Sequence, residues 1–190
     1  MQKSMLRRLK IFSAVLKWLF IVALIIYPAM YIIISSLGLL MEKTAFHIQH
    51  KAGIWLLLKF PIAQLFGLPT SIQVAGVLIS FIPVLLFMFK NYYLARLFNL
   101  YQKEVIFSLN NVRYIRNIGI VILIAECFNP FYQIFMSLLI SAQNAPGLHK
   151  IHFAISGMNL SMILMAIIII VVSWIMREGV ELEQEHKLTV

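Results

Sequence analysis

The sequence predicts an all-α membrane protein: a bundle of four transmembrane helices with a cytoplasmic helical extension between the second and third helices. Two observations lead to this prediction. Of the 190 residues, 62% are hydrophobic and only 12% are charged, against about 25% charged residues in an ordinary soluble domain. The mean hydropathy is +0.91. A soluble fold of this length has no room to bury so much apolar surface, so lipid must be the solvent for much of it.

Four apolar runs are long enough to cross a bilayer, which takes about 20 helical residues. Because backbone polar groups must be hydrogen-bonded inside lipid, each run is expected to be a helix. Only one charged residue, Glu126, falls within them. The chain, residues 1–190, is therefore expected to form a single integral membrane domain, with spans at about 18–40, 71–89, 117–141 and 158–176.

The distribution of Lys and Arg predicts the orientation. There are 16 of them against 7 acidic residues, and most flank the apolar runs. Twelve lie in the N-terminal segment, the second connection (90–116) and the C-terminal tail, whereas four lie in the other two connections. Since positive residues collect on the cytoplasmic side, both termini and the second connection are predicted to be cytoplasmic, in a multi-pass protein of the inner (plasma) membrane. Because these Lys and Arg residues flank the predicted membrane spans, they do not indicate direct binding to nucleic acid.

The first connection contains an apolar stretch, residues 54–68, that is too short to span and is interrupted by Lys59 and Pro61. It predicts an interfacial or re-entrant segment on the outer face. A poorly ordered hydrophobic loop is the alternative.

The second connection is predicted to be helical, because apolar residues recur at 94, 97, 98 and 101 and no Gly or Pro lies between Val84 and Ile118. Positions i, i+3, i+4 and i+7 share one helical face. The second helix is therefore expected to continue to about Lys103, about 50 Å from Ser71, and to project beyond a hydrocarbon core of about 30 Å. A break is expected at 104–107, after which Ser108 has the position of an N-cap, with Asn111 where a capping box prefers Glu or Gln.

Two motifs resemble a known family. Residues 94–103 (LARLFNLYQK) with 106–119 (IFSLNNVRYIRNIG), and the ending 177–190 (REGVELEQEHKLTV), resemble the central and closing motifs of the bacterial family of domain of unknown function 2975 (DUF2975). The resemblance covers roughly residues 72–190. At Glu104 and Val105 the chain departs from the family, which often has a glycine shortly before the Ile-Phe pair.

The resemblance implies a small four-helix inner-membrane protein without an assigned reaction. Family members are often encoded beside a small helix-turn-helix regulator of the Cro/CI type. By this analogy the chain is expected to be a regulatory membrane partner of such a transcription regulator, sensing a signal at the membrane. The basic second connection and the acidic tail would supply the partner-binding residues, which are Arg96, Lys103, Arg113, Arg116, Glu181, Glu183 and Glu185. A solvated acidic tail is the alternative.

Glu126 is a second candidate site, because it lies near the middle of the third span. Asn129, Gln133 and Ser137 follow on the same helical face. Lipid cannot satisfy such a stripe, so it is expected to face the bundle interior or a watery cavity. An intramembrane carboxylate favours cation or proton binding, and thus a small transporter. The alternative is a protonated Glu126 hydrogen-bonded to a neighbouring helix.

Histidines form a third pattern, with two i, i+3 pairs in the predicted outer connections: His47 with His50, and His149 with His152. Four imidazoles would suit a transition metal or a pH sensor, although interfacial or solvated histidines are the more ordinary interpretation, and no cofactor is expected. No nucleophile–base pair, phosphate loop or zinc motif occurs in the sequence, so an enzyme is not expected. The span lengths allow a monomer or a homodimer.

Overall fold

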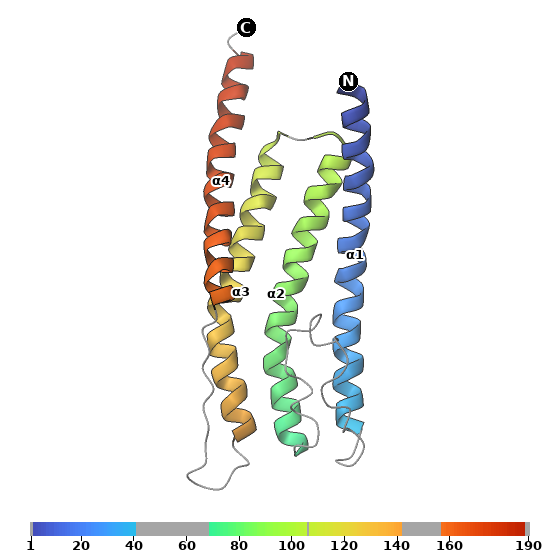
Figure 1. Cartoon of the computed structure of the whole chain (residues 1–190), viewed down its shortest axis with the longest axis vertical. Coiled ribbons are helices and arrows are strands. Elements are labelled where there is room, and N and C mark those ends of the chain that lie inside the picture. Colours follow the sequence, from blue (N-terminus) through green and yellow to red (C-terminus); the bar gives the residue numbers. More distant parts are fainter. Residues whose placement is uncertain (1, 41–68, 106, 142–156, 189–190) are drawn as a thin grey trace. The chain divides into compact units, whose positions relative to one another are not determined.

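The computed structural model describes residues 2–40, 69–105, 107–141 and 157–188. Within these ranges there are four helices and no strands: α1 (Gln2–Leu40), α2 (Thr70–Gln102), α3 (Leu109–Ser141) and α4 (Gly157–Leu188) (Figure 1). Each of the four is long and apolar enough to cross a membrane. The predicted all-α fold with four membrane helices is therefore confirmed, and the chain is a multi-pass membrane protein.

All four helices extend beyond the predicted spans, and α3 begins at Leu109, eight residues before the predicted start at 117. α1 begins at Gln2, 16 residues before the predicted span at 18, and α4 continues to Leu188, 12 residues after the predicted end at 176. α2 has 33 residues and ends at Gln102, which confirms that the second helix continues to about residue 103. The added segments are rich in Leu, Lys, Arg, Gln and Glu, which all have high helix propensity.

The described residues divide into two compact units. Unit 1 takes in Met1–Ile26, Leu86–Cys127 and Ser156–Val190, and unit 2 takes in Tyr27–Leu85 and Phe128–Ile155. Three helices contribute to both units, and each has one internal proline within three residues of its unit boundary: Pro28 in α1, Pro83 in α2 and Pro130 in α3. Proline removes a backbone hydrogen bond from a helix, so the division falls where three helices each lack one.

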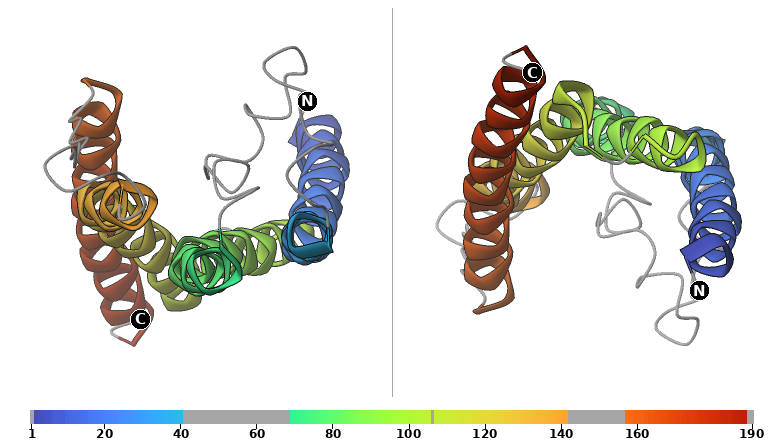
Figure 2. Two further views of the ribbon diagram at one scale, coloured as in Figure 1. Left: turned by 90° about the horizontal axis from the view of Figure 1, so that it is seen from below. Right: turned by 90° about the horizontal axis from the view of Figure 1, so that it is seen from above.

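Within unit 1 the helical segments follow one another in chain order, with α2 between α1 and α3, and α4 beside α3 (Figures 1 and 2). The contact between α3 and α4 is close at Gly119. A Cβ built there would lie 2.8 Å from Ile170 Cγ1 and 3.1 Å from the Ala166 carbonyl oxygen. Glycine at this position thus allows the two backbones to approach, as small residues do between membrane helices.

Unit 2 has a small apolar core around Tyr132 and Met136 of α3, against which Ile79 of α2 packs. The described apolar side chains elsewhere are largely exposed, among them Ile25, Leu78 and Phe131. Exposed apolar patches of this extent are not found on soluble monomers. They are expected of helices whose outer faces contact lipid.

The predicted outer segment 54–68 and the four predicted site histidines lie outside the described residues.

Candidate binding surface at the terminal end of unit 1

The connection between α2 and α3 begins with a tight helix cap. Glu104 N donates to Tyr101 O (3.0 Å) and Val105 N donates to Leu100 O (3.1 Å). These are the two hydrogen bonds of a Schellman motif, in which the residue at the position of Glu104 adopts a left-handed conformation and is usually glycine. Glu104 has φ 63°. The helix therefore ends as predicted, with a glutamate where a glycine would be unstrained.

Two side chains hold the start of α3. Ser108 Oγ accepts a hydrogen bond from Asn111 N (3.3 Å), so the predicted N-cap is confirmed. Asn111 is fully buried, and its Nδ2 donates to Val105 O (2.7 Å) across the turn. Asn111 thus does not close a capping box on Ser108, because its shorter side chain bonds the backbone of the connection instead. The two caps and this cross-turn bond fix the connection.

The N-terminal part of α1 is attached to the same region. Lys17 Nζ donates to Gln102 Oε1 (2.8 Å) and lies 3.4 Å from Asn99 Oδ1. One level further out, Lys10 Nζ lies 3.7 Å from Glu104 Oε1. These contacts place α1 beside the last turns of α2, so that the N-terminus, the α2–α3 connection and the C-terminal part of α4 all belong to one end of unit 1. We call it the terminal end.

Three apolar side chains of the connection are exposed, and we call them the connection patch. They are Val105 (39% exposed), Phe107 (71%) and Leu109 (41%). Lys103 and Arg113, two of the predicted partner-binding residues, flank the patch in sequence and are also exposed. The terminal end therefore combines exposed apolar side chains with exposed basic side chains, a combination typical of protein-binding surfaces.

Other predicted partner-binding residues have contacts within the chain. Arg96 Nε donates to Tyr92 OH (3.1 Å), and its guanidinium lies 5.3 Å from the centre of the Tyr92 ring. Glu181 accepts from Arg177 Nε (2.7 Å) one turn before it on α4. Arg116 is half-buried. These three residues are less suited than Lys103 and Arg113 to reach a partner.

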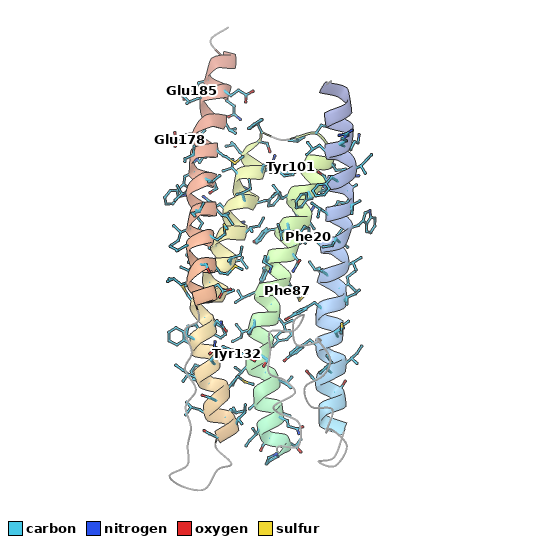
Figure 3. All side chains as sticks on the ribbon, in the orientation of Figure 1. Phe20, Phe87, Tyr101, Tyr132, Glu178 and Glu185 are labelled. Carbon is cyan, nitrogen blue, oxygen red and sulfur yellow. The ribbon has the colours of Figure 1, made fainter. Side chains whose placement is uncertain are left out.

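The acidic tail is part of a helix. α4 is continuous to Leu188, with Glu183 and Glu185 exposed on its final turns (Figure 3 labels Glu178 and Glu185). The contact between Gly119 and Ile170 gives a common level for α3 and α4. From this level toward the terminal end, α3 extends ten residues to Leu109, about 15 Å, and α4 extends eighteen residues to Leu188, about 27 Å. The end of α4 therefore extends about 12 Å past the first residue of α3.

The predicted intramembrane stripe lies on one face of α3, and all four residues are half-buried: Glu126, Asn129, Gln133 and Ser137. Glu126 belongs to unit 1 and the other three to unit 2. Ser137 Oγ donates to Ile134 O (2.9 Å), one turn back in its own helix. In unit 2 the most buried side chains of α3 are instead Tyr132 and Met136, so the stripe lies beside the buried face.

Sequence analysis missed a hydroxyl network in unit 2. Tyr132 OH and Ser80 Oγ share a hydrogen bond of 2.9 Å, and Tyr31 OH donates to Val77 O, one turn from Ser80. Tyr31, Ser80 and Tyr132 are all buried, and they connect α1, α2 and α3. Hydroxyl residues recur one turn apart in the apolar runs, but this spacing does not show which helices pair. Interhelical hydrogen bonds of this kind hold membrane helices together.

Among the residues that the structure describes, no group of three or more His, Cys, Asp or Glu side chains is placed to hold a metal ion. The two predicted histidine pairs lie outside those residues.

We compared the chain with known proteins and protein families. Neither the curated proteins nor the solved structures include a match to the chain. A family model, described as a protein of unknown function (DUF2975), matches residues 40–190. The match takes in the second, third and fourth membrane helices together with the connection between α2 and α3. Because it covers well over half of the chain, this protein belongs to the DUF2975 family.

Proposed function

We propose that this protein is a regulatory protein of the bacterial inner membrane, with both termini in the cytoplasm, that binds a cytoplasmic helix-turn-helix transcription regulator at its terminal end. No reaction is assigned to it. The observation that carries the proposal is the connection patch, whose three apolar side chains are exposed at the terminal end. The excess of Lys and Arg in the segments of the terminal end supports the cytoplasmic orientation.

Lipid does not account for the connection patch. The apolar run of α2 ends at Lys90, and Gln102 is twelve residues, about 18 Å, further along the helix. On α3, Leu109 lies seven residues, about 10 Å, beyond Arg116. The headgroup layer extends only about 5–8 Å beyond the hydrocarbon on each side. The patch is thus at or beyond the outer limit of the lipid headgroups, where Phe107 at 71% exposure faces water unless a protein covers it.

The chemistry of the patch indicates what it binds. Aromatic anchors such as Phe107 contribute most when they enter a pocket of the partner. The exposed Lys103 and Arg113 beside it favour a partner whose pocket has an acidic rim, since complementary charge guides association. A small regulator with such a pocket would be held at the membrane and away from DNA when bound.

Affinity purification from host membranes in mild detergent tests the proposal. The wild-type protein is expected to recover a helix-turn-helix regulator, identified by mass spectrometry, whereas Phe107→Ala is expected to lose it. Phe131→Ala is the matched control, because Phe131 is 60% exposed on α3 but belongs to unit 2. Equal recovery with Phe107→Ala, or recovery of no such regulator with the wild type, would contradict the proposal.

A small transporter centred on Glu126 is the second candidate, and one observation favours it: the Glu126 Oε2 atom is buried within a membrane helix. A carboxylate in this position is a candidate for proton or cation exchange. The wild-type protein in liposomes would then carry protons or a cation, and Glu126→Gln would abolish the flux because it removes the charge while keeping the shape. Wild-type liposomes that leak no faster than empty ones would reject this function.

A further inference from the structure

The two helices at the ends of the unit 1 row, α1 and α4, present matching outer stripes. On α1 the buried or α2-facing positions include Lys10, Ser13 and Lys17. The opposite side of α1 has a stripe of residues spaced alternately by three and four positions, and all of them are exposed. They are Arg8, Ile11 (58%), Val15 (59%), Trp18 (61%) and Val22 (47%). This is the spacing of a helix-packing seam.

α4 has a stripe of the same spacing. Ala166, Ser173 and Val180 are the buried residues of α4, and they recur every seven positions. The residues two positions before or after them point roughly the opposite way, because each step turns the helix by about 100°. They form an exposed stripe at Leu182 (56%), Glu178, Ile175 (67%), Val171 (42%), Ile168 (57%) and Leu164 (55%).

Each stripe carries a charge at the terminal end of unit 1, and the two charges are opposite. Arg8 belongs to the α1 stripe and Glu178 to the α4 stripe, and both side chains are exposed. Since α1 enters unit 1 at this end and α4 leaves it there, helices α1 and α4 of two copies in one membrane would pack antiparallel. Placing Arg8 opposite Glu178 then places Ile11 opposite Ile175, Val15 opposite Val171, Trp18 opposite Ile168 and Val22 opposite Leu164.

We infer that a second copy of this chain covers these stripes, in a closed two-fold dimer in which α1 of each copy packs against α4 of the other. A two-fold axis makes the same contact twice, so both outer helices of both copies are used and no further copy is recruited. Lipid covers the membrane-embedded part of these stripes equally well, but it offers no reason for the opposite charges of Arg8 and Glu178 at the terminal end. The Arg8–Glu178 pair sets the register more than the affinity, because exposed ion pairs contribute little. The inference does not depend on the proposed partner binding, which uses the connection patch.

Disulfide trapping between singly substituted copies tests the dimer. Cys127, the free cysteine, is first replaced by Ser. One copy then carries Ile11→Cys or Val22→Cys, and a co-expressed copy carries Ile175→Cys or Leu164→Cys. Copper phenanthroline added to membranes oxidises two neighbouring thiols to one disulfide, and a non-reducing gel detects the product at twice the monomer mass.

The matched combinations 11 with 175 and 22 with 164 are expected to link. The mismatched combinations 11 with 164 and 22 with 175 are the controls, because each places the two thiols eleven residues out of register, about 16 Å. Since each copy has one cysteine, every link is between molecules. No link in either matched combination, or equal links in all four, would overturn the inference.

Two further measurements test the register and the closure. Arg8→Glu on the Ile11→Cys copy is expected to reduce linking to Ile175→Cys severalfold, and Glu178→Arg on the other copy is expected to restore it. Copies carrying both Ile11→Cys and Ile175→Cys are expected to stop at the dimer. A ladder of larger products would contradict the closed two-fold arrangement, and a linked monomer would show that α1 meets α4 of its own chain.

Discussion

Glu104 has an unusual backbone conformation for its residue type. Its φ of 63° costs an L-residue with a side chain about 1–2 kcal/mol, a cost that glycine does not have. The ion pair with Lys10, at 3.7 Å between exposed side chains, offsets at most about 1 kcal/mol of it. The glutamate therefore supplies a contact between α1 and the connection at a cost to the stability of the turn.

Comparing Glu104→Gly with Glu104→Ala separates these effects. Both variants lose the carboxylate, but only Gly relieves the backbone, so Glu104→Gly is expected to be more stable than Glu104→Ala by about 1 kcal/mol. Thermal unfolding in detergent measures the difference. Equal midpoints for the two variants would show that the turn carries no such cost.

Asn111 is the residue on which the connection most depends. Asn111→Ala removes the bond to Val105 O together with the buried side chain that makes it, at an expected cost of about 0.5–1.5 kcal/mol. Asn110→Ala is the matched control, because the neighbouring Asn110 is exposed and its loss is expected to change stability by less than about 0.5 kcal/mol. Proteolysis of the connection in detergent-solubilised protein provides a second readout, with cleavage faster for Asn111→Ala only.

At the scale of the helices, two glycines have opposite roles. A methyl group at Gly119 would meet Ile170 at 2.8 Å and the Ala166 backbone at 3.1 Å, whereas one at Gly179 would meet nothing within 4 Å. Gly119→Ala is thus expected to push α3 from α4 and to cost about 1–3 kcal/mol. Gly179→Ala is expected to stabilise α4 by about 1 kcal/mol through helix propensity. Unfolding midpoints that move in the same direction for both would contradict this packing.

The helical end of α4 is expected to matter for partner binding as well. It carries Glu183 and Glu185 outward past the start of α3, within reach of a protein bound at the connection patch. Deleting residues 178–190 is therefore expected to abolish recovery of the regulator while the protein stays in the membrane. Unchanged recovery by the truncated protein would remove the tail from the binding surface.

The four membrane helices could be predicted from the sequence, because a backbone inside lipid must satisfy its own hydrogen bonds and an apolar run therefore forms a helix. The ends of α2 and α3 followed from local signals, a Gly-free and Pro-free run and an N-cap serine. The helical state of residues 2–17 and 177–188 was not foreseen, because their charged residues place them outside the continuous apolar runs from which the spans were predicted. The hydroxyl network of Tyr31, Ser80 and Tyr132 was also missed, since helix pairing decides which hydroxyls meet and sequence spacing does not show it.

At the scale of the whole molecule, the proposed function requires a chain that crosses the bilayer four times with the connection patch in the cytoplasm. The four membrane helices bring both termini and the α2–α3 connection to one side, and the positive residues favour the cytoplasm. A patch on the opposite side would exclude a cytoplasmic regulator as its partner.

Labelling from the two sides of the membrane tests this most directly. In a Cys127→Ser background, a single cysteine at Phe107 or at Lys150 is treated with a membrane-impermeant maleimide in intact spheroplasts and in inverted vesicles. The account predicts that Phe107→Cys is labelled only in inverted vesicles and Lys150→Cys only in spheroplasts. Labelling of Phe107→Cys in intact spheroplasts, or of both sites from the same side, would contradict it.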